Sequence, residues 1–121
     1  MASVNIVNVT SILPFTVNGS VTTSSVDIID VPADKLYKVN TIIIANIDGT
    51  NSANVTIGVS TTNGSNYYNL ASTVAVPADS TLIVTDKNSS FYLDETDLLR
   101  VLASANNDLT YLVSGEILDD A

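Results

Sequence analysis

The sequence predicts an all-β fold, an antiparallel β-sandwich with a jelly-roll-like arrangement. Short segments of alternating polar and apolar residues recur along the chain, with turn-forming residues roughly every 8–12 positions. Thr, Ser and Asn are abundant beside Leu, Ile and Val, a balance typical of strands joined by polar turns. The one conceivable helix, residues 94–102, is short and contains the β-branched Val101, so we expect a turn followed by a strand there.

The longest strand signal covers residues 37–47 and follows the turn-forming segment Val31–Asp34. From Tyr37 onward the odd positions are almost all apolar or β-branched, whereas the even positions are polar at both ends. Ile42 and Ile44 interrupt the polar series in its middle. Because successive side chains point to opposite faces, we expect the odd positions to face the core and these two isoleucines to face outward. An outward apolar pair indicates a central strand, or one whose outer face is covered by something else.

The N-terminal residues predict an edge strand or an arm. Val4 and Ile6 fall on one side of an extended chain, and Val7 and Val9 fall on the other, so both sides are apolar. Two such sides favour an element whose faces meet different surfaces. The expected organisation is residues 1–20 as an N-terminal strand or arm making inter-subunit contacts, and residues 21–121 as the β-sandwich domain.

Edge and turn signals divide the rest of the chain into strands. Pro14 has no N–H to give to a strand ladder, which places it at an edge or a bend, and Asn18-Gly19 predicts a tight turn. Residues 53–60 alternate most cleanly, and residues 98–103 and 109–118 follow the same rule. The predicted core residues, each an in-phase apolar member of its strand, are Val39, Ile43, Val55, Ile57, Val59, Leu99, Val101, Tyr111 and Val113.

An internal repeat marks the corners of the predicted sandwich. Val31-Pro32-Ala33-Asp34 recurs as Val76-Pro77-Ala78-Asp79, and each copy precedes a strand. The acidic segment Leu93–Asp97 takes a similar place before Leu98. Pro fixes φ at a turn position and Asp can bond its own backbone shortly afterwards, so we interpret the three segments as equivalent corners.

Composition and charge exclude several classes of function. The net charge is −9 with four Lys and Arg, so nucleic acid is expected to be repelled. Without Cys or His the chain has neither disulfides nor thiolate or imidazole metal ligands. The start of the chain lacks the basic and apolar regions of a signal peptide, and the most apolar window, residues 42–47, is too short for a bilayer. We therefore expect neither secretion nor membrane insertion.

The acidic segment is also the strongest candidate for chemistry. Asp94, Glu95 and Asp97 offer carboxylates to Ca²⁺ or to a glycosidase pair, but their spacing matches no calcium-loop motif. The favoured interpretation is a solvated acidic turn in which Asp97 caps the next strand. Since no His is present to activate a Ser or Thr nucleophile, we expect no enzymatic activity and no cofactor or metal.

Tyr67 and Tyr68, flanked by Asn66 and Asn69, leave two interpretations open. Aromatic faces beside amide donors suit a carbohydrate ring. Adjacent strand residues face opposite ways, however, which favours one tyrosine in the core and the other at the rim or in a protein contact.

The order of motifs resembles a known family. A Val-Pro-Ala-Asp turn leads into the Ile-rich strand ending in Ala45-Asn46, and a Val-Thr-Ile-Gly-Val strand follows at residues 55–59. Next come Tyr67-Tyr68, the second Pro-Ala turn, Tyr92-Leu93 before the acidic turn, and residues 98–101. Over Val31 to Ile117 the chain resembles small β-sandwich virion structural proteins of tailed bacteriophages, although Asp34 and Asp79 stand where Gly is commoner in such turns.

This resemblance implies a non-enzymatic capsid decoration (cement) protein that binds and stabilises the shell of major capsid protein, or else a tail- or neck-associated protein. It implies other virion proteins as partners, a homo-oligomer such as a trimer or dimer, a place on the capsid exterior, and synthesis in the host cytoplasm. A carbohydrate-binding adhesin module is the alternative from another class. The candidate protein-interface residues are Val4, Ile6, Val7, Val9, Ile42, Ile44, Tyr67 and Tyr68.

Overall fold

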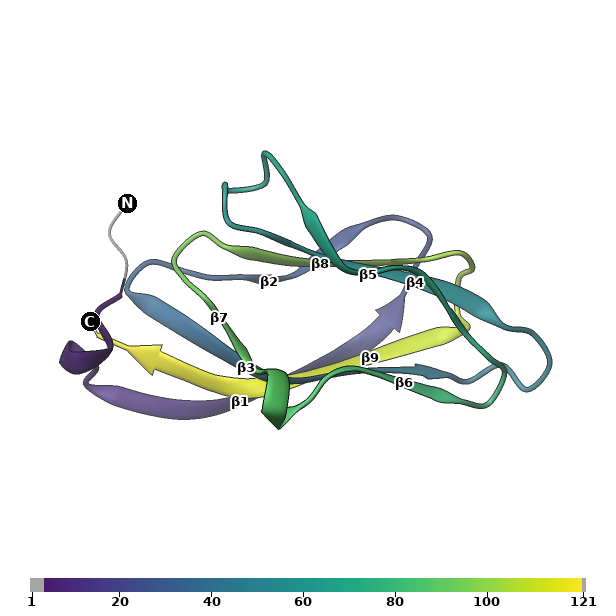
Figure 1. The fold of residues 1–121 in the computed structure, drawn as a ribbon, viewed down its shortest axis with the longest axis horizontal. Coiled ribbons are helices and arrows are strands. Elements are labelled where there is room, and N and C mark those ends of the chain that lie inside the picture. The colour runs from purple at the N-terminus through teal and green to yellow at the C-terminus, as the bar shows by residue number, and fades with distance from the viewer. Residues whose placement is uncertain (1–3, 121) are drawn as a thin grey trace.

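The computed structural model describes residues 4–120 and consists of two antiparallel sheets packed face to face (Figure 1). The strands are β1 (Ser11–Val21), β2 (Val26–Asp30), β3 (Lys35–Asn46), β4 (Ala53–Ser60), β5 (Tyr68–Val76), β6 (Thr81–Thr85), β7 (Phe91–Leu93), β8 (Leu98–Ala103) and β9 (Leu109–Asp119). Two 3₁₀ turns, η1 (Ile6–Asn8) and η2 (Lys87–Ser89), complete the secondary structure of these residues. The predicted all-β sandwich is confirmed, including a strand rather than a helix at β8.

The strand order identifies the sandwich as a jelly roll. The larger sheet has the order β1-β9-β3-β6, with β7 paired to β3, and the smaller sheet has the order β2-β8-β4-β5. β1 and β3 lie in the larger sheet, and β2, β4 and β5 lie in the smaller one. The chain then returns, with β6 and β9 pairing with earlier strands of the larger sheet and β8 with earlier strands of the smaller one, which is the double Greek key of this architecture. β3 lies inside the larger sheet between β9 and β6, so the central position predicted for it is confirmed.

A β-bulge in β3 reverses the predicted facing of its side chains. The pairing with β9 shifts register between Val39 and Thr41, which leaves Asn40 as an extra residue. Val39 therefore faces the core before the bulge, and Ile42 and Ile44 face it afterwards, all three fully buried at 0% exposure. The prediction that Ile42 and Ile44 face outward is wrong, because unbroken alternation was assumed across the bulge. Ile43, predicted to be in the core, lies on the outer face instead.

The facing strand carries a residue that makes room for the bulge. Gly115 on β9 pairs with Val39, and a Cβ at this position would overlap the carbonyl oxygen of Lys38. Only a residue without a side chain allows the two backbones to approach so closely. The Gly115 position and the Asn40 bulge therefore belong together.

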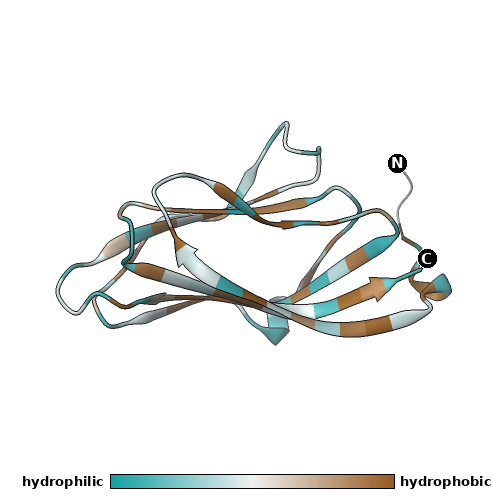
Figure 2. Ribbon diagram, turned by 180° about the vertical axis from the view of Figure 1, so that it is seen from behind, coloured by the Kyte–Doolittle hydropathy of each residue, from teal (hydrophilic) through white to brown (hydrophobic). Residues whose placement is uncertain are grey.

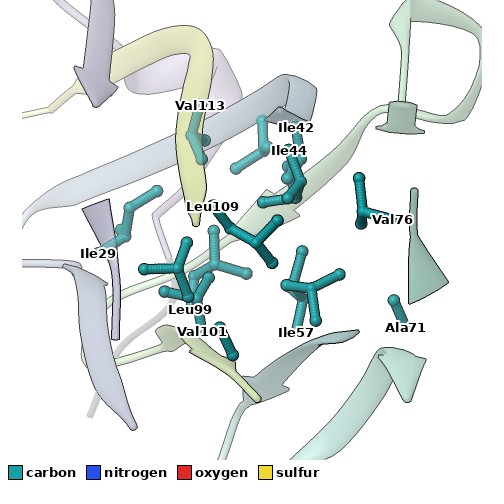
Figure 3. Packing of buried hydrophobic residues seen from close by; sticks show 14 of the residues in the cluster. Ile29, Ile42, Ile44, Ile57, Ala71, Val76, Leu99, Val101, Leu109 and Val113 are labelled. Atoms are coloured by element: carbon teal, nitrogen blue, oxygen red, sulfur yellow. The ribbon is translucent and has the colours of Figure 1, made fainter. Parts of the chain in front are cut away.

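The core lies between the two sheets and draws on almost every strand (Figure 3). Ile42, Ile44 and Leu109 from the larger sheet meet Ile57 and Leu99 from the smaller one. Each such side chain contributes about 1.5–3 kcal/mol when removed from water. Val59 and Tyr111 are half-buried against the core, and the predicted core residues that are confirmed as fully buried are Val39, Val55, Ile57, Leu99, Val101 and Val113.

The three predicted corners share one backbone feature. Asp34, Asp79 and Thr96 all have positive φ, at 64°, 58° and 65°. The first and third corners are joined directly, since the Val31 N–H donates to the Asp97 carbonyl at 3.1 Å and the Thr96 N–H donates to the Val31 carbonyl at 2.9 Å. The left-handed turns explain why the repeated segments end strands at equivalent places.

β1 is an edge strand of the sandwich, whereas the segment before it, in which alternation along an extended chain was predicted, contains the 3₁₀ turn η1. β1 pairs with β9 along its whole length, from Ser11 opposite Asp119 to Val21 opposite Leu109. The predicted turn at Asn18-Gly19 is wrong, because both residues lie within β1. Gly19 lies against the Tyr111 ring, where an added Cβ would stand 3.1 Å from a ring carbon. The glycine therefore marks close side-chain packing rather than a turn.

Candidate protein-interaction surface

The segment before β1 is held to the sandwich at both ends and exposes apolar side chains between them. The Val4 N–H donates to Asp94 Oδ1 at 3.2 Å, and the Thr10 N–H donates to the Asp119 carbonyl at 2.8 Å. Between these two anchors, Ile6 is 53% exposed and Val7 is 88% exposed. Val4 and Val9 are half-buried. Of the predicted interface residues in this segment, Ile6 and Val7 therefore offer the most surface to a partner.

The exposed apolar surface continues onto the free edge of the larger sheet. Ile12 and Leu13 on β1 are 58% and 61% exposed. We call Ile6, Val7, Ile12 and Leu13 the N-terminal strip; Figure 2 shows apolar residues at the end of the molecule where both chain termini lie. β1 is the last strand on its side of the sheet. Sequence reasoning did not select Ile12 or Leu13, although Pro14 marked their strand as an edge.

A second apolar surface lies on the outer face of the larger sheet. Ile43 on β3 is paired with Ile83 on β6 and with Leu112 on β9. Ile83 is 61% exposed and Leu112 is 37% exposed. A shallow groove of about 490 Å³ lies beside this row, lined by Asn18, Gly19, Ser20, Ile43, Ala45, Thr110, Tyr111 and Leu112. The outer apolar face expected on the longest strand therefore exists, with Ile43 in place of Ile42 and Ile44.

Tyr67 lies on the outer face of the smaller sheet in a small polar network. Its hydroxyl donates to Asp27 Oδ1 at 2.8 Å, and the Arg100 guanidinium carbon lies 3.3 Å from the ring centroid. Asp27 and Arg100 are cross-strand partners on β2 and β8. Partial burial raises the pKa of the Tyr67 phenol, and the hydrogen bond to Asp27 raises it further. Since Arg100 covers one ring face, that face is closed to a stacked sugar ring.

Tyr68 begins β5 and is 74% exposed. Neither tyrosine belongs to the core cluster, so the interpretation that placed one of them in the core is wrong. A pocket of about 210 Å³ lies beside Tyr67 and Arg100, and Tyr68 does not line it. The two tyrosines therefore differ: Tyr67 is held by Asp27 and Arg100, whereas the Tyr68 ring is exposed to solvent.

The acidic turn is a structural corner whose carboxylates bond to backbone. Asp97 Oδ2 accepts from the Asp94 N–H and Glu95 Oε2 accepts from the Asp34 N–H, both at 2.8 Å. Glu95 and Asp97 are only 8% and 6% exposed, so the expectation of a solvated turn is wrong for these two residues. Burial raises the pKa of the Asp97 carboxyl. Within residues 4–120, no group of three or more acidic, His or Cys side chains is placed to hold a metal ion.

Comparisons with known proteins support the fold and go no further. No protein-family model matches the sequence, and no curated protein matches it. Among solved structures, a subunit of the disulfide-linked pili of Bacillus endospore appendages aligns with a TM-score of 0.56 and 14% identity, over 92% of this chain and 88% of that one. A chain of the acid-stable capsid of a Helicobacter pylori bacteriophage aligns with a TM-score of 0.52 and 7% identity, over 93% and 91%.

A chain of the infectious bursal disease virus particle aligns with a TM-score of 0.50 and 7% identity, over 92% of this chain and 32% of that one. At such identities the shared property is the fold. The chain is thus a jelly-roll β protein with the architecture found in viral capsids and in a bacterial pilus. No helix in residues 4–120 is both long and apolar enough to cross a membrane.

Proposed function

We propose that this chain is a non-enzymatic structural protein of a tailed-bacteriophage virion, attached to the capsid exterior as a decoration protein. The observation that carries the proposal is the N-terminal strip, four large apolar side chains between 53% and 88% exposed beside a free strand edge. The fold that the chain shares with a chain of a bacteriophage capsid and with part of a chain of the infectious bursal disease virus particle supports a place in a virion.

The free edge of β1 is the physical basis of the proposal. Alternate residues of β1 turn their N–H and C=O groups away from β9, and natural proteins protect such edges with charges, bulges or cover. Here only Pro14 interrupts the edge, and no residue from 4 to 26 is charged. A shell protein that adds a strand to β1 satisfies the backbone groups, and its side chains lie beside Ile12 on one face of the sheet and beside Leu13 on the other.

The pilus alternative fits the sequence less well. The endospore appendages are disulfide-linked pili, and this chain contains no cysteine. Disulfide links of that kind are therefore excluded for this chain, and the exposed apolar side chains of the N-terminal strip offer a surface for non-covalent contacts instead.

A matched pair of variants tests the attachment surface. Leu13→Asp and Ile47→Asp introduce the same charge at positions 61% and 62% exposed, at opposite ends of the sheet. In a sedimentation assay with shells lacking the native protein, we expect Leu13→Asp to lose attachment while Ile47→Asp keeps wild-type occupancy. Equal attachment of both variants would show that the strip is not the contact surface. A wild type that never binds shells would favour a tail or neck position.

A carbohydrate-binding role is the second candidate, and the exposed ring of Tyr68 is what favours it. Glycan binding that is lost in Tyr68→Ala, together with an absence of shell binding, would support that role. Tyr68→Ala is expected to leave shell attachment through the N-terminal strip unchanged.

A further inference from the structure

We propose that the outer face of the larger sheet is a self-association surface, on which a second copy of this chain packs sheet against sheet. The surface is distinct from the N-terminal strip, and the inference does not depend on attachment to a capsid.

The geometry is a set of parallel rows across four strands. One row runs from Ile83 through Ile43 and Leu112 to Asn18, following the pairing of β6, β3, β9 and β1. The next row places Ala45 among hydroxyl-bearing residues, in the order Thr81, Ala45, Thr110 and Ser20. An apolar row beside a row of short hydroxyl side chains can pack against its own copy about a two-fold axis, because an isologous contact needs a surface that complements itself.

The distribution of charge selects a second copy as the occupant. The chain carries thirteen acidic and four basic residues, yet neither row contains any of them. The charged pair on this face, Lys38 opposite Glu116, lies toward the other end of the strands. Because a charged surface finds nothing to pair with on these two rows, they favour an uncharged partner surface, and the same two rows of a second copy are such a surface. Two copies, each with a net charge of −9, then meet through the uncharged part of the sheet.

The size of the surface sets the strength of the contact. Four strands spaced about 4.8 Å apart span about 19 Å, and the two rows span about 14 Å along the strands. The footprint is thus about 270 Å², a third of the roughly 800 Å² per partner that a stable interface buries. We therefore infer a weak, reversible dimer that forms at high protein concentration, as on a particle surface.

Sedimentation velocity over a concentration series tests the dimer. The wild type is expected to shift from monomer to dimer, and Ile83→Glu combined with Leu112→Glu is expected to weaken dimerisation at least tenfold. Leu70→Glu adds the same acidic side chain at an exposed site on β5 of the smaller sheet, away from this face, and should dimerise like the wild type. A wild type that stays monomeric up to about 1 mM, or a double variant that dimerises normally, would overturn the proposal.

A single-cysteine reporter gives a second readout, since the native chain contains no thiol. Leu112→Cys should give a crosslinked dimer with a short bis-maleimide much faster than Leu70→Cys on the smaller sheet does. Equal crosslinking rates would count against this face. The capsid sedimentation assay separates the two proposals, because the outer-face double variant is expected to attach to shells while Leu13→Asp is expected to dimerise normally. Loss of dimerisation in Leu13→Asp alone would move the dimer contact to the β1 edge and refute the proposal.

Discussion

Replacing Ile42 with alanine is expected to destabilise the fold far more than the same replacement at Ile43. Ile42 is fully buried in the core, whereas Ile43 is half-buried on the outer face. Truncating a buried isoleucine costs about 2–5 kcal/mol, because the lost transfer energy adds to the cavity that is left. Truncating the half-buried neighbour loses only part of the transfer energy, about 1 kcal/mol.

The comparison is direct because the two changes are chemically identical and adjacent. For a chain of this size, 1 kcal/mol lowers the melting temperature by about 3–5 °C, so Ile42→Ala should melt at least about 6 °C below the wild type. Urea unfolding with unchanged m-values would assign the difference to native packing. An equal loss at both positions, or a larger loss at Ile43, would refute the bulge at Asn40 and restore unbroken alternation along β3.

Three further outcomes follow from the structure. Gly115→Ala should cost about 3 kcal/mol or more in urea unfolding, since the new Cβ meets the Lys38 carbonyl oxygen, and a mild loss would mean that the bulge can relax. Because burial raises the pKa of Asp97 above its unfolded value of about 3.9, stability should fall as pH rises from there through the raised folded pKa. Asp97→Asn should flatten that dependence, and an unchanged pH profile of the urea midpoint would contradict the assignment. Tyr67→Phe removes the hydrogen bond to Asp27 and should cost about 1 kcal/mol; no change in unfolding free energy would show that the bond contributes nothing.

The fold class was predictable because the alternation and the corners are local features. Leu99, Val101 and Val113 lie in strands without a bulge in the relevant stretch, and they face inward as predicted. The repeated corner segments indicated turns, and the positive φ at Asp34 and Asp79 explains why both repeats end a strand.

The wrong predictions arise where a contact with a residue distant in sequence overrides the local alternation or turn preference. The bulge at Asn40 depends on Gly115, and no periodicity within β3 reveals a residue 75 positions away. The Asn18-Gly19 pair has a strong turn preference, but eleven paired residues and the Tyr111 ring above Gly19 override it. Tyr67 lies outside the core, where its hydroxyl bonds to Asp27 and its ring contacts Arg100. Both residues are distant in sequence, so the local pattern did not reveal these contacts.

The candidate surface was predictable only in part. An N-terminal segment with apolar residues on both sides pointed to Ile6 and Val7, and their exposure agrees with a surface role. Ile83 and Leu112 could not be assigned to this surface from sequence, because only the strand register shows that both lie beside Ile43. A phase error of one residue thus moved the expected outer face from Ile43 to its two neighbours.

The most direct test of the proposed function is the copy number of this chain on purified virions, measured by quantitative mass spectrometry, together with its accessibility to an antibody on intact particles. Decoration of the capsid predicts many copies per particle, all accessible from outside. A few copies or about a dozen would indicate a neck or tail position. Complete absence from intact virions would contradict the structural role itself.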